Sequence, residues 1–150
     1  MTLGHGKLGG DRVIENISMP ACLNPRPSAW FAKQLCLEGF ITGTPLFQLC
    51  LGIKWGAPYD PETMMYQKAQ LPTDAIWAAF GVSRNEFPAM AQAVLLGGHV
   101  RVGMEDNLWL EPGVYASNAT LVEKTVKIIR LLSAEVALPA EARKILSPFR

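Results

Sequence analysis

The sequence after residue 45 alternates between apolar runs and helix signals, and this alternation constrains the fold more than any other feature. Three apolar runs, at residues 45–53, 75–81 and 97–107, have the length and composition of buried strands. A helical segment follows each of them, so that three β-then-α units succeed one another. This succession predicts an α/β fold with a parallel sheet and right-handed crossovers, either a barrel or a doubly wound sheet.

Capping signals predict where the helices begin and end. Asp60 is placed to cap a helix that ends near Gln70, because a proline follows it at the first helical position. Ser83 and Glu86 have the spacing of a capping box, which predicts a helix running to Leu96 and ending at the glycine pair that follows. Further helices are predicted at residues 28–38, 118–132 and 139–146, and residues 12–17 form either a short strand or a linker.

Composition and charge limit the class of protein. The 150 residues are 49% hydrophobic and 18% charged, as in one compact domain, and the formal net charge is only +1. Lysines and arginines form no cluster, so we expect no nucleic-acid partner and no anionic membrane surface. Apolar runs are too short to span a membrane and residues 1–7 lack the core of a secretory signal, which favours a cytoplasmic protein.

Two features that could bind a ligand have simpler explanations. Cys22, Cys36 and Cys50 are widely spaced among apolar residues, which indicates buried free thiols rather than disulfides or a zinc knuckle. Residues 4–9 match the G-x-G-x-x-G dinucleotide pattern, but only three residues precede them and no helix signal follows. A flexible tail is therefore favoured there, and a nucleotide-binding domain is kept as a weak alternative.

Charged side chains interrupt the third apolar run. Burying a charge costs several kcal/mol, on the order of the whole stability of a small domain, unless a partner compensates it. Alternation along a strand places Arg101 and Glu105 on the face opposite the valines, with Asp106 where the strand ends. Either an internal ion-pair network fixes this strand end, or Glu105 binds a cation while Asp106 acts as a base. His99, at the other end of the strand, is expected to be a packed, hydrogen-bonded histidine.

The eleven residues Gly97-Gly-His-Val-Arg-Val-Gly-Met-Glu-Asp-Asn107 resemble the signature of the β-keto acid cleavage enzymes, the 3-keto-5-aminohexanoate cleavage family. Residues 45–52, 81–84, 113–123 and 139–143 match in family order, so the resemblance covers residues 28–146. It implies a (β/α)₈ TIM-type barrel that uses Zn²⁺ and acetyl-CoA. The implied reaction converts a β-keto acid and acetyl-CoA into acetoacetate and a new CoA thioester.

The resemblance also implies roles for three residues. Glu105 corresponds to a zinc ligand, and Arg101 and Asp106 correspond to the catalytic pair. In that pair Asp106 anchors or activates, while Arg101 orients Asp106 and the carboxylate of the keto acid. The chemistry is consistent, because Zn²⁺ polarises a keto oxygen and a guanidinium clamps a carboxylate through two hydrogen bonds.

The sequence departs from the family in two respects. The family takes two more zinc ligands from a His-x-His pair, whereas this chain contains only His5 and His99. A whole barrel needs roughly 250 residues, and only the last units of the family are matched. We therefore expect residues 28–150 to be the C-terminal part of an incomplete barrel, residues 1–27 to lie outside the family match, and zinc binding by the isolated chain to be weak.

Two consequences follow for activity and assembly. Either the sequence is a truncated C-terminal portion of an enzyme, or the missing half is supplied by another chain, and in both cases we expect the chain alone to lack a working metal site. Open sheet edges pair readily with other chains, which predicts a homo-oligomer. The alternative from a different functional class is a non-catalytic remnant or assembly module that keeps the same fold.

Overall fold

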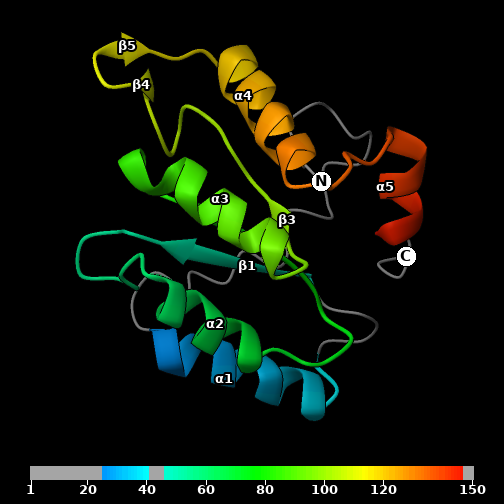
Figure 1. Cartoon of the computed structure of the whole chain (residues 1–150). Helices are drawn as coiled ribbons and strands as arrows, with labels where there is room; N and C mark the ends of the chain where they lie inside the picture. The colour runs from blue at the N-terminus through cyan, green and yellow to red at the C-terminus, as the bar shows by residue number, and fades with distance from the viewer. Residues whose placement is uncertain (1–24, 41–45, 147–150) are drawn as a thin grey trace.

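The computed structural model describes residues 25–40 and 46–146. The proposed strand or linker at residues 12–17 and the glycine motif at residues 4–9 lie outside these ranges. In chain order the elements are α1 (Pro25–Leu37), β1 (Leu46–Leu51), α2 (Pro61–Ala69), β2 (Ile76–Gly81), a 3-10 turn (Ser83–Asn85), α3 (Glu86–Leu95), β3 (His99–Val100), β4 (Trp109–Glu111), β5 (Val114–Tyr115), α4 (Asn118–Leu131) and α5 (Pro139–Ile145) (Figure 1).

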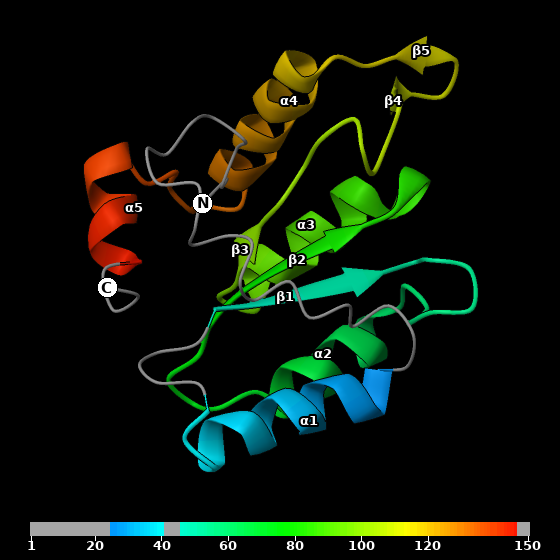
Figure 2. The same ribbon diagram turned by 180° about the vertical axis from the view of Figure 1, so that it is seen from behind.

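The centre of the fold is a three-stranded parallel sheet in the order β1-β2-β3. Leu46 pairs with Ile76 at one end of the sheet, and Ala79 pairs with Val100 near the other. Helices α2 and α3 connect the strands and cover the same face, because they lie in front of the sheet in Figure 1 and behind it in Figure 2. The predicted α/β class with a parallel sheet is therefore confirmed.

The hydrophobic core lies between that face of the sheet and the two helices. Leu51 and Val100 of the strands are fully buried together with Met64 of α2 and Met90 of α3. Burying one side chain of this size contributes about 1.5–3 kcal/mol relative to leaving it in water. Helix α4 packs against α3, and α1 packs against α2.

Side-chain caps mark the starts of α2 and α4. The Asp60 side chain accepts a hydrogen bond from the Thr63 backbone N–H at 2.7 Å, and Pro61 occupies the first turn of α2, as predicted. Helix α4 starts with a capping box, in which Ser117 accepts from the Thr120 backbone N–H and the Thr120 hydroxyl accepts from the Ser117 backbone N–H. Each cap satisfies amide donors that the first helical turn leaves unpaired.

Helices α3 and α4 end in the same way. In α3 the N–H of Gly97 donates to Val94 and that of Gly98 to Ala93; in α4 the N–H of Ser133 donates to Arg130 and that of Ala134 to Ile129. These are the paired hydrogen bonds of a Schellman ending, which needs a left-handed residue after the C-cap. Gly97 adopts φ 78° at that position, as the predicted glycine stop requires, whereas α4 places Ser133 there at φ 57°.

The predicted capping box at Ser83 and Glu86 is wrong. Ser83 starts a 3-10 turn with φ 58°, and the N-cap of α3 is Asn85, whose side chain makes no capping hydrogen bond. The carboxylate of Glu86 instead extends to the loop after β3. Glu86 therefore has the sequence spacing of a capping residue, but its side chain contacts a loop that is distant in sequence.

The third predicted strand is also much shorter than its apolar run. Only His99 and Val100 pair with β2 as strand residues, and the chain turns after Val102. Side chains replace the missing strand partners, since Glu86 accepts from the N–H of Gly103 and Asn118 accepts from the N–H of Met104, both at 2.9 Å. The run is apolar enough for a strand, but these distant acceptors fold it into a loop.

A two-stranded hairpin follows, in a segment where the sequence pattern predicts no strand. Strands β4 and β5 pair antiparallel, and the rings of Trp109 and Tyr115 stack with centroids 4.4 Å apart. The Pro-Gly pair between the strands was the available turn signal, and Gly113 adopts φ 81° there. In Figures 1 and 2 the hairpin projects beyond the end of α4, away from the sheet.

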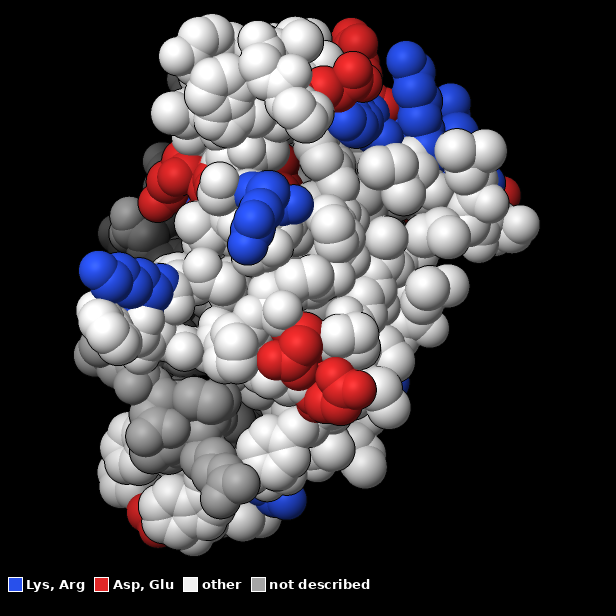
Figure 3. Space-filling model, turned by 60° about the vertical axis from the view of Figure 1, so that its left-hand side comes forward, with Lys and Arg blue, Asp and Glu red and all other residues white. Residues whose placement is uncertain are grey.

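Three further observations concern the surface and the thiols. Of the cysteines predicted to be buried, Cys50 is buried and Cys36 is partly buried, while Cys22 lies outside the described ranges. Among the described helices, none is long and apolar enough to cross a bilayer. On the face drawn in Figure 3, basic side chains form small separate groups among acidic and uncharged ones.

Candidate active site

The candidate site is built on the loop that follows β3, residues 101–107, hereafter the site loop. It leaves the carboxyl end of a parallel strand, where ligands bind in β/α folds. The carbonyl of Gly103 accepts from the N–H groups of Asp106 at 3.0 Å and Asn107 at 3.1 Å, which closes the loop into a tight turn. This turn brings residues four and five positions after Arg101 back onto its side chain.

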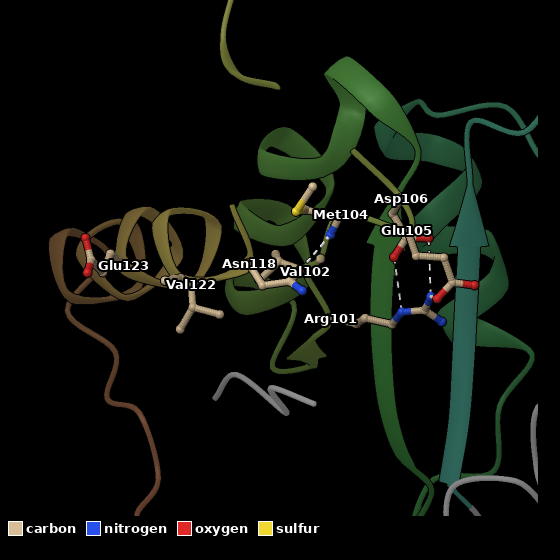
Figure 4. Close-up of a pocket in the computed structure, with 10 residues that line it drawn as sticks. Arg101, Val102, Met104, Glu105, Asp106, Asn118, Val122 and Glu123 are labelled. Carbon is tan, nitrogen blue, oxygen red and sulfur yellow. Dashed lines mark hydrogen bonds and ion pairs between the residues drawn. The ribbon is translucent and has the colours of Figure 1, made fainter. Parts of the chain in front are cut away.

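Arg101 is the centre of the site. Its Nη2 lies 2.5 Å from Oε2 of Glu105, and its Nε lies 3.1 Å from Oδ2 of Asp106 (Figure 4). The guanidinium carbon lies 4.5 Å from the centroid of the Phe80 ring on β2, a cation–π contact that fixes the plane of the group. The structure therefore brings together the three site residues that the sequence singled out.

The two carboxylates have different surroundings. The Asp106 side chain is 8% exposed, whereas the Glu105 side chain is 75% exposed, and that of Arg101 lies between them at 23%. A carboxylate removed from water needs a compensating charge, which Arg101 supplies to Asp106. Glu105 projects toward solvent, so its ion pair with Arg101 contributes little to stability and leaves the side chain accessible.

A cleft of about 560 Å³ opens beside this cluster. Residues 101–106 form one wall and the first turns of α4 form the other, with Asn118, Ala119, Val122 and Glu123 along it. Figure 4 shows the Arg101 group on one side and Glu123 pointing away on the far side. The cleft is large enough for a small organic acid and has cationic and anionic groups on the same wall.

Three residues that sequence reasoning did not assign to the site hold the loop in place. Glu86 accepts from the Gly103 N–H and from Asn107 Nδ2, each at 2.9 Å, and Asn118 accepts from the Met104 N–H. The backbone N–H of Ser83 donates to the carbonyl of Asp106 at 2.7 Å. The sequence contains one signal for this role, the acidic residue among apolar neighbours at position 86. Its spacing from Ser83 predicts a helix cap instead.

Two titratable groups around the site have shifted pKa values. Burial raises the pKa of Glu86, and the charge of Asp106 raises it further, while the hydrogen bonds from Asn107 and Gly103 lower it. Burial lowers the pKa of His99 at the start of β3, which favours the neutral imidazole. His99 is half-buried, in line with the predicted packed histidine.

The described residues do not by themselves fit a zinc ion. Within residues 25–40 and 46–146 no three His, Cys, Asp or Glu side chains are grouped so that they could hold a metal. Glu105 is engaged by Arg101 and has no second ligand beside it other than Asp106, which is bound to the same guanidinium. A zinc site normally takes at least three protein ligands, so Glu105 would need partners from outside these ranges.

In parallel α/β folds small ligands bind at the carboxyl end of the sheet, which is where this chain carries its arginine-bridged carboxylate pair. Comparison with known proteins makes the class specific. The chain belongs to the beta-keto acid cleavage enzyme family, whose model matches residues 27–147, and the predicted resemblance is confirmed.

The chain is similar to several curated relatives. It is 47% identical over 115 residues to the 3-dehydrocarnitine:acetyl-CoA trimethylamine transferase of Rhizobium meliloti (strain 1021), covering 77% of this chain and 38% of the relative. It is 38% identical over 136 residues to the 3-keto-5-aminohexanoate cleavage enzyme of Acetoanaerobium sticklandii, covering 89% of this chain and 50% of the relative. The 3-oxoadipate:acetyl-CoA acetyltransferase of Cupriavidus necator is 34% identical over 112 residues, 72% of this chain and 39% of its own. The chain thus spans half or less of the length of these relatives.

Proposed function

We propose that this chain supplies the Arg101–Asp106 part of the active site of a β-keto acid cleavage enzyme. The enzyme takes a β-keto acid and acetyl-CoA and gives acetoacetate and a new CoA thioester. The observation that carries the proposal is the joint pairing of Arg101 with the buried Asp106 and the exposed Glu105, on one wall of a cleft at the carboxyl end of the sheet. Acetyl-CoA is named as the co-substrate of two of the relatives compared above.

In this proposal Arg101 and Asp106 are the catalytic residues. Arg101 compensates the charge of the buried Asp106 carboxylate and fixes its orientation through Nε. Arg101 also lines the cleft, and a guanidinium can bind the carboxylate of the keto acid through two hydrogen bonds. Asp106 then serves as the anchoring or activating base beside the bound substrate.

Glu105 is proposed as a zinc ligand, following the family resemblance. Its exposed carboxylate beside the cleft supports the assignment. Glu105 could release Arg101 and bind a cation instead, because Arg101 would still be paired with Asp106. Bound zinc would polarise the keto oxygen of the substrate. The remaining ligands would come from residues other than those described, since the described ones form no metal cluster.

The proposed architecture is a sector of a (β/α)₈ barrel comprising residues 28–150, with residues 1–27 outside it. Two features support a barrel over a doubly wound sheet: the strand order β1-β2-β3 does not reverse, and α2 and α3 cover one face only (Figure 2). Doubly wound sheets have helices on both faces and a reversal of strand order. Cytoplasmic location stays a prediction.

Self-association is also proposed. Strands β1 and β3 are the edges of the described sheet, and exposed apolar side chains gather on the hairpin, among them Leu108, Val114 and Tyr115. Unpaired edges and exposed apolar surface favour association between copies. Sedimentation velocity over a range of concentrations tests it, and a monomer at every concentration would contradict it.

The direct test of the function is formation of CoA thioesters from acetyl-CoA and a panel of β-keto acids. The sharpest form uses a chimera, in which residues 27–147 replace the matching segment of the Rhizobium meliloti relative. We expect the chimera to turn over substrate, and Glu105→Gln, Asp106→Asn and Arg101→Lys to reduce turnover by at least about 100-fold, typical of loss of a catalytic group.

Glu123→Gln is the matched control for Glu105→Gln. Glu123 is an exposed carboxylate on the opposite wall of the same cleft, so its replacement removes an equal charge without touching Arg101. We expect it to change turnover less than about threefold, as for a surface charge. Equal effects of the two substitutions, or full activity in Glu105→Gln, would show that the assigned roles are wrong.

A further inference from the structure

The Glu86 side chain is fully buried, yet none of the described lysines or arginines forms an ion pair with it. It is the first residue of α3, so the positive end of the helix dipole offsets part of its charge. Two hydrogen bonds from uncharged groups complete its surroundings. An anion is therefore held in the interior by a helix terminus and by neutral donors alone.

Both hydrogen bonds reach the site loop. Oε1 accepts from the Gly103 N–H and Oε2 accepts from Asn107 Nδ2, each at 2.9 Å. Gly103 and Asn107 flank the turn that carries Glu105 and Asp106. One carboxylate therefore spans that turn, and its two oxygens fix both ends of it relative to α3.

The second hydrogen bond continues beyond the loop. Asn107 Nδ2 also donates to the carbonyl of Trp109 at 2.7 Å, and Asn107 Oδ1 accepts from the Trp109 N–H at 3.0 Å. The amide of Asn107 is thereby oriented with its nitrogen toward Glu86, because its oxygen is already engaged. The side chain at position 86 thus needs two acceptor oxygens, which glutamate provides and glutamine does not.

The arrangement carries a cost in stability that the loop contacts must offset. Burial and the nearby Asp106 charge both disfavour the anion, as the raised pKa of Glu86 records. A neutral glutamine of the same shape would avoid that cost but would present Nε2 to another donor. A purely structural role would favour the neutral side chain, whereas fixing the turn at both ends requires the carboxylate.

We propose that Glu86 is a positioning residue, which holds Arg101 and Asp106 in register by fixing the turn between Gly103 and Asn107. This inference rests on the function proposed above, because it gives Glu86 its role through those two catalytic residues. Glu86 itself is closed off from the cleft, since it is fully buried and does not line it. It acts through the loop and does not contact substrate.

The test is amide hydrogen exchange on the full chain, followed residue by residue by NMR. In Glu86→Leu, which removes both acceptor oxygens, we expect exchange at Gly103 to accelerate about tenfold or more, the effect of losing a hydrogen bond of about 1.4 kcal/mol. Exchange at core amides of β2, such as Ala79, should stay within twofold. Unchanged exchange at Gly103, or equal acceleration in β2, would overturn the inference.

Two further variants sharpen the test. Glu86→Gln keeps one acceptor oxygen, which can accept from the Gly103 N–H, and gives up only the hydrogen bond from Asn107 Nδ2. We expect exchange at Gly103 in Glu86→Gln to stay within about threefold of the parent, and an acceleration as large as in Glu86→Leu with β2 intact would overturn the inference. Glu62→Gln is the matched control, because Glu62 is an exposed acid in the first turn of α2, and it should leave the site loop unchanged.

Turnover then separates this inference from the proposed function. In the chimera described above, Glu86→Leu should lower kcat about tenfold or more, and Glu86→Gln should keep more of it than Glu86→Leu. An inactive chimera with normal exchange at Gly103 would contradict the proposed function and leave the loop contact intact. A fully active Glu86→Leu chimera would overturn the positioning role alone.

Discussion

Arg101 and Asp106 form an ion pair in which Nε lies 3.1 Å from Oδ2, and the aspartate side chain is 8% exposed. The same guanidinium binds Glu105, whose side chain lies mostly in water. Arg101 therefore pairs with one buried and one exposed carboxylate, and only the buried one depends strongly on the pair for its stability in the charged form. Removing the cation takes away the ion pair that Asp106 forms with Arg101, whereas removing Glu105 leaves that pair in place.

The first prediction concerns these unequal demands. Arg101→Met should lower the free energy of unfolding by about 3–5 kcal/mol, the usual cost of breaking a buried ion pair. Glu105→Gln should lower it by no more than about 1 kcal/mol, as for an exposed pair. Urea denaturation of both variants checks this, and equal losses would contradict the difference in burial.

The second prediction concerns pH. Because the pKa of Glu86 is raised above 4.5 in the folded chain, the folded state binds this proton more readily than the unfolded state. The Glu86 contribution is therefore greatest at low pH, decreases as pH rises through the raised pKa, and is constant above it. The unfolding free energy of the parent minus that of Glu86→Gln should follow this curve.

The subtraction matters because the charge of Asp106, on the site loop, also acts on Glu86. Contributions that are the same in the parent and in Glu86→Gln cancel in the difference. A difference curve that rises with pH would show that Glu86 is stabilised as an anion, against the direction given by its burial.

The third prediction concerns the two matched helix ends. Ser133→Gly should stabilise the chain by about 1 kcal/mol, since a serine in the left-handed conformation is strained and glycine is not. Gly97→Ala, at the same position after α3, should destabilise it by about 1 kcal/mol for the same reason. Urea midpoints shifted in the same direction for both would contradict this account.

The fourth prediction concerns the contact between β2 and α3. A Cβ at Gly81 would lie 2.4 Å from the backbone oxygen of Asn85 and 2.8 Å from Cβ of Ala89, so Gly81→Ala should force α3 away from the sheet. We expect a loss of about 1–3 kcal/mol, the usual cost of overpacking, together with faster exchange at Gly103 as α3 carries Glu86 outward. Gly103→Ala is the control, because its nearest neighbour lies at an ordinary 3.5 Å.

The fifth prediction concerns zinc. This chain should bind zinc weakly, because Glu105 has no complete ligand set around it among the described residues. Equilibrium dialysis followed by metal analysis measures it, with Glu105→Gln as the comparison. One tightly held equivalent that disappears in Glu105→Gln would show that this chain contains the remaining ligands.

Features set by neighbours in sequence could be predicted. The apolar runs of β1 and β2, the Asp60 cap and the glycine stop of α3 each depend on a few adjacent residues, and all were confirmed. The clustering of Arg101 with Glu105 and Asp106 was predictable for the same reason, since the three lie within six positions.

Features set by distant residues could not be predicted. The third apolar run becomes a loop because Glu86 and Asn118, 17 and 14 positions away from their partners, take up the N–H groups of Gly103 and Met104. A strand pattern records only the face on which a side chain lies, so it did not reveal that Asp106 is buried and Glu105 exposed. Such differences depend on the tertiary turn.

The stacked rings of Trp109 and Tyr115 make the hairpin an optical reporter for the loop beside it. Two aromatic chromophores held 4.4 Å apart couple electronically, and the backbone of Trp109 is tied to Asn107 by two hydrogen bonds. Circular dichroism in the near ultraviolet should therefore register a loosened turn before any helix melts. The near-ultraviolet spectrum therefore reports the order of the site loop without a label or a substrate.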